Sequence, residues 1–273
     1  SLGETEVRNP AYDPEAGTPE KIARDYGFGE SGGSVTLGGK DLEVREWTPE
    51  KITVAVPRGI PSGQLMVTRG DNGQATRMGV TVTVGPVSGG IRHVFPSSDA
   101  DATPIQDAID RVETGALILV HPGTYSEQIV LWKDVRLQGA GAYSTVLDAV
   151  TQSGDVERWR DKVNELVDSG GIDLLPDQDV GFGIFSGLGL FPTEQAPGIL
   201  VVGKMGEFRA DPHAQIDGFT ITGAANGGGI MVNGYVNHLE ISNNRIVSNQ
   251  GTFGGGIRLG HPVTLFAFGG EIV

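Results

Sequence analysis

A few side chains near the end of the chain combine types and spacing that could bind an anionic group and transfer a proton. Asn233, Tyr235 and His238 lie close together, and Arg258 and His261 follow about one repeat later. An arginine can bind a sugar carboxylate, and a histidine can move a proton near neutral pH. Arg258 and His261 are therefore candidate catalytic residues, and the other three are candidate ligand-binding residues. The alternative is that all five are ordinary surface residues.

Motifs with better-defined chemistry are absent from the sequence. It contains no GxSxG, HExxH, P-loop or EF-hand pattern. Asp211, Asp217 and Glu240 are isolated in sequence, which counts against a paired-carboxylate glycosidase site. The absence of cysteine excludes disulfides and thiol chemistry. We predict no metal site and no cofactor; Ca²⁺ would suit the acidic composition, but no motif supports it.

Composition and charge narrow the classes of partner. The net charge is −14, from 34 acidic and 20 basic residues. Such a balance repels a phosphate backbone, so we expect no nucleic-acid partner. No run of about 18 apolar residues occurs, so we expect no membrane span. Glycine makes up 43 of 273 residues without a collagen-like period, which indicates a β-rich protein with many tight turns.

The first third of the chain predicts a β-sandwich. Residues 1–20 are polar, contain three prolines and predict a linker or arm. Residues 21–85 hold short segments of alternating apolar and polar residues, which is typical of half-buried strands. Turn sequences such as Asp71-Asn72-Gly73 separate these segments.

The order of motifs in 21–85 resembles an IPT/TIG immunoglobulin-like domain. The matching segments are Gly27-Phe28-Gly29, Val35 to Gly39, and Trp47 followed by Ile52 to Pro57. The resemblance implies an immunoglobulin-like sandwich that acts as a spacer or a binding module. For Phe28 and Trp47 we expect core packing.

A linker and a helix follow. Residues 86–102 are rich in Gly, Pro, Ser and Asp and predict a linker. A helix is predicted at 103–112, with Thr103 as N-cap, Pro104 at the first position and Gln106 completing a capping box. One apolar stripe runs along this helix: Ile105, Ala108, Ile109 and Val112.

Strands of three to five residues, each followed by a turn, occupy 116–139 and suit a solenoid. This stretch resembles the first coils of the pectin-lyase-like right-handed parallel β-helix superfamily, through the helix at 103–112 and the Pro122 to Glu127 segment (Pro-Gly-Thr-Tyr-x-Glu). The resemblance implies that the helix caps the first coil and that Pro122 to Glu127 forms a corner. We therefore predict an all-β protein in which a right-handed parallel β-helix occupies 103–273.

An internal repeat supports the solenoid independently. When the chain is laid on itself one coil further along, Gly227-Gly228-Gly229-Ile230 falls on Gly254-Gly255-Gly256-Ile257, and Asp217 to Thr220 falls on Asn244 to Val247. The repeat predicts that Ile230 and Val232 stack under Ile257 and Leu259. Met231, Asn233 and Arg258 are then expected to face outward. Three asparagines are expected at stacked corners: Asn243, Asn244 and Asn249.

Residues 150–198 interrupt the repeat as an insertion that begins with a helix. The apolar side of that helix comprises Val156, Trp159, Val163, Leu166 and Val167. Two interpretations stay open: the insertion shields one side of the solenoid, or it borders a binding face.

The sequence predicts that the β-helix is incomplete at its C-terminus, because no cap follows the last coil. Further coils of the same protein or a second chain would then complete it. We expect a secreted or cell-surface protein that interacts with polysaccharide or another surface ligand. The alternative is a polysaccharide lyase or glycoside hydrolase acting on uronate-type polymers, with its site on the β-helix face or beyond residue 273. A structural spacer or part of an adhesin is a third interpretation.

Overall fold

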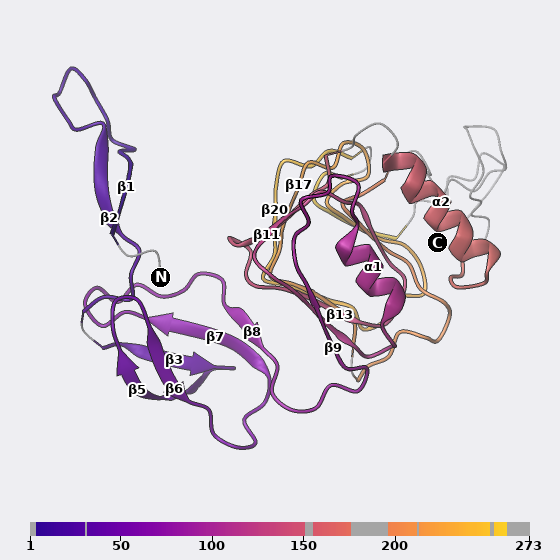
Figure 1. The fold of residues 1–273 in the computed structure, drawn as a ribbon, viewed down its shortest axis with the longest axis horizontal. Helices are drawn as coiled ribbons and strands as arrows, with labels where there is room; N and C mark the ends of the chain where they lie inside the picture. The colour runs from indigo at the N-terminus through magenta and orange to yellow at the C-terminus, as the bar shows by residue number, and fades with distance from the viewer. Residues whose placement is uncertain are drawn as a thin grey trace, which may run out of the picture. The chain divides into compact units, whose positions relative to one another are not determined.

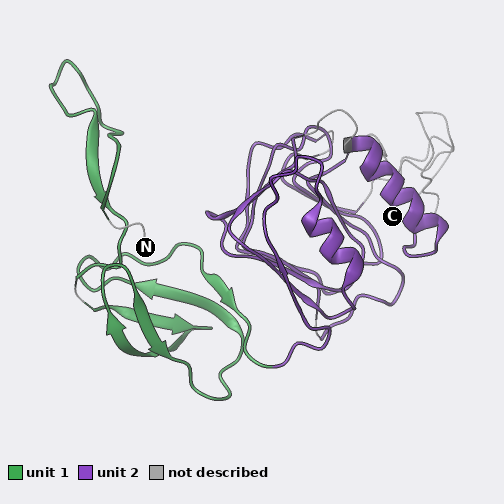
Figure 2. Cartoon of the chain, viewed as in Figure 1, with its two compact units in different colours: residues 1–85 green, residues 86–273 purple. Residues whose placement is uncertain are grey.

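A computed structural model describes the chain except for residues 1–3, 31, 151–154, 176–195, 212, 252–253 and 261–273. The chain divides into two compact units, residues 1–85 and residues 86–273 (Figure 2). The division falls where the sequence predicts the end of the first domain. Strands dominate both units, and the two described helices, α1 and α2, lie in the second (Figure 1).

Unit 1 begins with a β-hairpin. Strand β1 (Glu4–Arg8) pairs antiparallel with β2 (Lys21–Asp25), and Val7 faces Ile22 in the register. The prediction of a linker over 1–20 is therefore wrong for β1. Both faces of the hairpin are largely exposed, so its strands do not need to alternate apolar and polar residues. The strand β1 therefore could not be recognised from the sequence pattern.

The rest of unit 1 consists of short antiparallel strands. One sheet has the order β4-β3-β7-β8, and β5 pairs with β6 alone. The bounds are β3 (Ser34–Leu37), β4 (Lys40–Asp41), β5 (Glu43–Trp47), β6 (Ile52–Ala55), β7 (Gly63–Thr68) and β8 (Val80–Val82). Gly73, in the predicted Asp71-Asn72-Gly73 turn, has a φ of 67°, a left-handed backbone that glycine adopts readily.

The apolar core of unit 1 is small. Val35, Leu37, Leu42 and Ile60 are buried, and Trp47 packs against them from the side. The Trp47 indole N–H donates to the Gly29 carbonyl at 3.1 Å, and its ring meets Phe28 edge-on with centroids 6.5 Å apart. The expected core packing is confirmed for Trp47, and Phe28 extends it through this ring contact.

Unit 2 contains three parallel sheets that the chain visits in rotation (Figure 1). The first sheet has the order β19-β16-β13-β10-β9, with bounds Glu240–Ser242, Gln215–Asp217, Arg136–Gly139, Leu117–Val120 and Ile91–Val94. The second comprises β11 (Gly123–Tyr125), β14 (Thr145–Asp148), β17 (Thr220–Thr222) and β20 (Arg245–Ile246). The third comprises β12 (Ile129–Leu131), β15 (Ile199–Val201), β18 (Ile230–Val232) and β21 (Ile257–Leu259). We call one passage through the three sheets a coil.

Strand β9 corrects the predicted linker at 86–102. It pairs in parallel with β10, with Val94 beside Val120, and so belongs to the first sheet. Val94 alone of its four residues is buried, because β9 is the edge strand. The apolar signal was correspondingly weak in the sequence.

The core of unit 2 lies between the three sheets. Alternate residues of each strand point inward, since successive side chains of a strand face opposite sides. The inward residues stack from coil to coil and are fully buried in all three sheets: Ile118, Leu137 and Ile216; Leu147 and Ile221; Ile129, Ile199 and Ile230.

The register corrects one part of the predicted repeat. Ile230 pairs with Ile257 and Val232 with Leu259, as the repeat predicts. In the other two sheets the offset between coils is slightly shorter, so Asp217 pairs with Ser242 rather than with Asn244. The connection from β20 to β21 is longer than that from β17 to β18, and this shifts the offset in the third sheet alone.

The predicted asparagine corners are confirmed. The Asn244 side chain accepts a hydrogen bond from the Phe219 N–H and donates to the Ile216 carbonyl, both in the preceding coil. Asn249 does the same with Ala224 and Ile221. Asn243 has a positive φ of 53° and donates to the Asp217 carboxylate.

Helix α1 (Pro104–Arg111) lies within the predicted 103–112, but the predicted capping box is wrong. Thr103 makes no side-chain cap hydrogen bond. Instead, the Glu127 carboxylate accepts hydrogen bonds from the N–H groups of Ile105 and Gln106, each at 3.0 Å. The cap thus comes from a residue far along the chain, which a local pattern could not reveal.

Helix α2 (Asp155–Asp168) confirms the helix predicted in the insertion 150–198. Trp159, Val163 and Leu166 pack on the outward residues Val130, Leu200 and Met231 of the third sheet. Met231 was expected to face outward and does so, but it is only 1% exposed because α2 covers it. The described part of the insertion therefore shields the third sheet.

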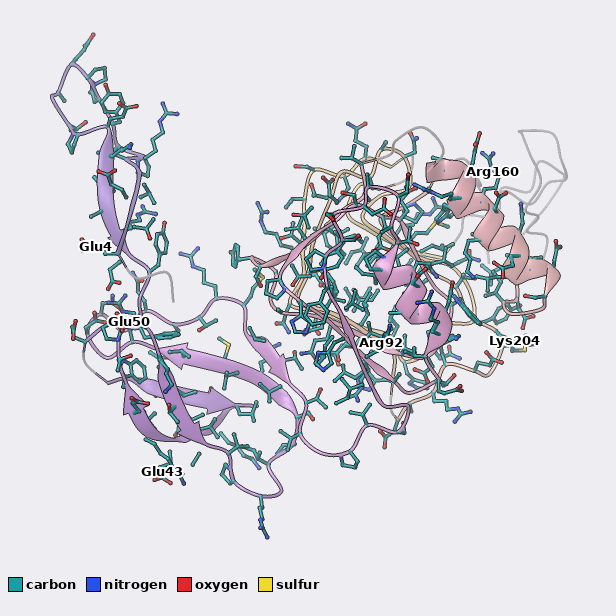
Figure 3. All side chains as sticks on the ribbon, viewed as in Figure 1. Glu4, Glu43, Glu50, Arg92, Arg160 and Lys204 are labelled. Carbon is teal, nitrogen blue, oxygen red and sulfur yellow. The ribbon has the colours of Figure 1, made fainter. Side chains whose placement is uncertain are left out.

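Neither described helix has the length and apolar character needed to cross a lipid bilayer. Charged residues such as Glu43 of unit 1 and Arg92 of unit 2 are exposed to solvent (Figure 3).

Candidate functional site

The outer face of the first sheet collects polar side chains from three successive coils. Strands β13, β16 and β19 place Arg136, Gln215 and Glu240 in one row. A second row, two residues along, contains Gln138, Asp217 and Ser242. The intervening residues Leu137, Ile216 and Ile241 point into the core. We call the six outward side chains the polar face.

Hydrogen bonds join the polar face across the strands. The Gln215 amide donates to Glu240 Oε1 at 3.3 Å and to Ser242 Oγ at 3.2 Å. The Ser242 hydroxyl donates to Asp217 Oδ1 at 2.9 Å. His213, which precedes β16, places Nε2 2.9 Å from Glu240 Oε2. The face is therefore pre-ordered before any ligand arrives.

The polar face brings together two carboxylates that are isolated in the sequence. Asp217 and Glu240 are diagonal neighbours on adjacent strands, because Asp217 pairs with Ser242 and Gln215 with Glu240. Asp217 is 1% exposed, and its Oδ2 has no hydrogen-bond partner among the described residues. These two residues, isolated in the sequence, thus lie on adjacent strands, because strands of successive coils pair although they are far apart in the chain.

Electrostatics keep Glu240, the exposed carboxylate of the polar face, ionised. Burial raises the pKa of Glu240, but the hydrogen bond from His213 and its neighbours outweighs it and holds that pKa below the ordinary value. The Glu240 side chain keeps 47% of its surface exposed. Glu240 is therefore an ionised, accessible acceptor rather than a proton donor at neutral pH.

A corner beside the polar face gathers further charged groups from three coils. Asp134 is 2% exposed, and its Oδ2 accepts a hydrogen bond from the Arg209 N–H at 3.0 Å. Burial raises the Asp134 pKa, and the charges of Arg209, His213 and His238 oppose that rise. The predicted ligand-binding residue His238 thus lies near Asp134, in a left-handed backbone with φ 61°.

The opposite end of the first sheet is aromatic. The His93 and His121 rings approach within 2.9 Å between Nδ1 and Nε2. Phe95 stacks on His121 with ring centroids 4.1 Å apart and is 60% exposed. His93 lies in the same row as Gln138 and Asp217, so the aromatic end and the polar face share one side of the sheet.

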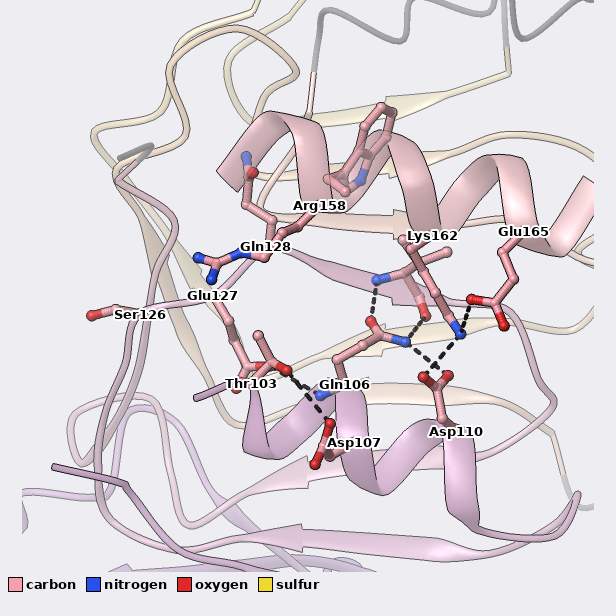
Figure 4. A pocket seen from close by; sticks show the side chains of 12 residues that line it. Thr103, Gln106, Asp107, Asp110, Ser126, Glu127, Gln128, Arg158, Lys162 and Glu165 are labelled. Carbon is pink, nitrogen blue, oxygen red and sulfur yellow. Dashed lines mark hydrogen bonds and ion pairs between the residues drawn. The ribbon is translucent and has the colours of Figure 1, made fainter. Parts of the chain in front are cut away.

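A separate cleft of about 260 Å³ lies between α1, α2 and β12 (Figure 4). Its one lysine, Lys162, is paired with carboxylates of the same cleft. Lys162 contacts Asp110 at 3.0 Å and Glu165 at 3.2 Å. Burial lowers the pKa of Lys162, but these two carboxylates outweigh it and leave that pKa above the ordinary value.

Glu127, at the side of the same cleft, is a buried carboxyl with a shifted pKa. Burial raises the pKa of Glu127 to about 7, against the opposing effect of the two N–H groups that it accepts. Because both oxygens bind the first turn of α1, we assign Glu127 a structural role. We therefore interpret the cleft as the contact region between the two helices and not as a binding site.

The remaining predicted site residues lie on the third sheet or beyond it. Arg258 follows Met231 in the outward row of the third sheet and is 8% exposed. Asn233 directly follows β18 and is 7% exposed, and Tyr235 has a φ of 57° in the next connection. Arg258 therefore lies on a different sheet from His213 and Glu240. His261 is outside the described residues, as is the predicted incomplete end of the β-helix.

Sequence reasoning missed His213, Gln215 and Glu240 as a group. The sequence does contain the corresponding repeat. When the chain is offset so that Gln215 aligns with Glu240, Asp217 aligns with Ser242. The glycine-rich segments of the third sheet repeat at a longer offset. That longer offset was the one recognised in the sequence, so the shorter repeat of the first sheet was missed.

Across the described ranges, no group of three or more His, Asp or Glu side chains is arranged to hold a metal ion. No protein-family model and no curated protein sequence matches this chain.

Proposed function

We propose that residues 103–273 form a right-handed parallel β-helix of the pectin-lyase-like kind and that residues 21–85 form an IPT/TIG-like sandwich. The rotation of the chain through three parallel sheets supports the first assignment. The antiparallel strand order and the Trp47 core support the second. We further propose that a protein of this architecture binds polysaccharide outside the cell or on the cell surface.

One observation carries the binding proposal: the first sheet presents two polar side chains on its outer side at each step from β13 to β19. Adjacent strands are spaced about 4.8 Å apart. Of these groups, Glu240 and the neighbouring His213 keep 47% and 41% of their side-chain surface exposed and can hydrogen-bond the hydroxyls of an extended polymer. The exposed Phe95 and His121 stack adds a flat apolar surface on which a sugar ring can lie.

Affinity electrophoresis and calorimetry of the full chain with neutral and uronate polysaccharides test this proposal. Replacing both His213→Ala and Glu240→Gln should weaken binding about tenfold, because two accessible partners of the ligand are lost. Glu207→Gln, an exposed change in the same unit, is the matched control and should leave affinity unchanged. Equal affinity of the double variant and the control would refute the site.

A second function, a lyase or hydrolase acting on uronate-type polymers, is favoured by the proximity of Asp217, Glu240 and His213. The full chain incubated with polygalacturonate would then release unsaturated products or new reducing ends. Loss of product in Glu240→Gln, with product retained in Arg258→Ala, would assign turnover to the first sheet. Tight binding without any product would leave the binding function alone.

A further inference from the structure

Unit 1 contains a cavity whose charge is opposite to that of the chain. The cavity has a volume of about 530 Å³ and lies between β2 and the segment that follows β7. Three arginines, Arg24, Arg69 and Arg77, line it, against one acidic residue, Asp25. In a chain with a net charge of −14, this local excess of cationic groups marks a site for an anion.

Arg69 forms the fixed part of the cavity. Its side chain is 14% exposed, and its guanidinium donates to the Gly27 carbonyl at 2.8 Å and to Asp25 at 3.0 Å. It also binds both oxygens of Asp71. Because these groups use its donors, Arg69 positions the walls of the cavity and leaves ligand contacts to other residues.

Arg24 and Arg77 are the groups left for a ligand. Within the part of unit 1 that the structure describes, neither forms an ion pair or a side-chain hydrogen bond, and both are exposed. An unpaired guanidinium offers a planar fork of donors that matches a carboxylate or sulfate group.

The other lining residues indicate what the anionic group is attached to. Tyr26 is 45% exposed and presents an aromatic ring at the cavity. Asn72 and Gln74 line the same cavity and supply side-chain amides. An aromatic ring and amides beside arginines suit a ring that carries hydroxyls and a negative charge.

We propose that this cavity binds an acidic saccharide, with Arg24 and Arg77 holding its carboxylate or sulfate group and Tyr26 stacking on its ring. The anionic character of the ligand follows from the cavity alone, whereas its saccharide character rests on the proposed function. The site would let unit 1 hold an acidic polymer independently of the polar face of unit 2.

Calorimetry of the full chain with three probes tests the proposal: an oligogalacturonate, a heparin-derived sulfated oligosaccharide and a neutral cello-oligosaccharide. Replacing both Arg24→Ala and Arg77→Ala should weaken binding of an acidic probe about tenfold or more, since two charge-assisted contacts are lost. The double variant Arg45→Ala with Arg58→Ala removes the same charge from exposed positions of unit 1 outside the cavity and is the control. It should change affinity less than about twofold.

The probes also distinguish the two anionic groups. Arginine-dependent binding of oligogalacturonate assigns the site to carboxylates, and arginine-dependent binding of the heparin fragment assigns it to sulfates; either supports the proposal. Failure to bind any acidic probe, equal binding of the neutral probe, or equal losses in the two double variants would overturn it. The unit 2 variant His213→Ala with Glu240→Gln, measured in parallel, should keep the arginine-dependent binding, which separates this site from the proposed function.

Discussion

The two helices of unit 2 meet the parallel sheets by different means. Helix α1 buries Ile105, Ala108 and Ile109 in the core. Polar contacts hold its two ends: Glu127 binds its first turn, and the Lys133 ammonium donates to the Asp110 and Val112 carbonyls at its other end. Helix α2 contacts the third sheet by apolar packing of Trp159 and its neighbours, and Lys162 adds an ion pair with Asp110 of α1.

The backbone that each helix covers explains the difference. Strand β12 is the edge of the third sheet, so its outer N–H and C=O groups have no strand beside them. Gln106 of α1 replaces the missing strand: its side chain accepts from the Val130 N–H at 2.7 Å and donates to the Val130 carbonyl at 3.2 Å. Helix α2 covers the outward side chains of paired strands, where apolar contact is sufficient. In unit 2 polar groups therefore bind the exposed strand edge, whereas apolar side chains cover the outward side of the third sheet.

The largest effect is expected from the apolar contact. Trp159→Ala removes a ring that is 3% exposed and should destabilise the docking of α2 by about 3–5 kcal/mol. Hydrogen exchange should show faster exchange of the α2 amides, whereas those of α1 should keep their protection. Equal loosening of both helices would show that they are not held separately.

Loss of the polar edge contact should cost nearly as much. Gln106→Ala leaves the Val130 N–H and carbonyl buried without partners, at a cost of about 2–4 kcal/mol in the free energy of unfolding. Arg111→Ala on the same helix breaks only an exposed ion pair and is the control, with a change within about 0.5 kcal/mol. Urea denaturation measures both, and a small loss in Gln106→Ala would refute its role as a substitute strand.

Glu127 should make the cap sensitive to pH. Its pKa is about 7 in the folded chain and about 4.5 when unfolded, so the folded state binds the proton more tightly. The stabilisation is complete below about pH 4.5 and is lost as the pH rises through 7, by about 3 kcal/mol in all. Urea denaturation from pH 4.5 to 8 should show this decline in the native protein and a flatter profile in Glu127→Gln. Parallel profiles would place the titration elsewhere.

The smallest effect is expected at the position that the sequence favoured as the cap. Thr103→Ala should change the free energy of unfolding by less than about 0.5 kcal/mol, because Thr103 makes no cap hydrogen bond. A loss near 1 kcal/mol, the usual value for an N-cap residue, would show that Thr103 shares the role with Glu127.

The features that could be predicted from the sequence are those that depend on the local pattern of apolar and polar residues. The strand-and-turn texture, the helices near 104–111 and 155–168 and the stacking of Ile230 under Ile257 follow from periodicity. The Glu127 cap, the Gln106 contact with Val130 and the His213–Glu240 pair join residues that are distant in the chain. Strands β1 and β9 escaped for a different reason: most of their residues are exposed, so pairing left almost no apolar signal.

The connections between the sheets also suggest how such a chain tolerates change in length. From the first sheet to the second, the connections contain two to five residues, whereas from the second to the third they contain 3, 50, 7 and 10. The strands on either side keep their pairing throughout, even around the insertion that carries α2. This corner is therefore the natural position for grafting a reporter peptide or a small domain, since growth there leaves the coil-to-coil alignment intact.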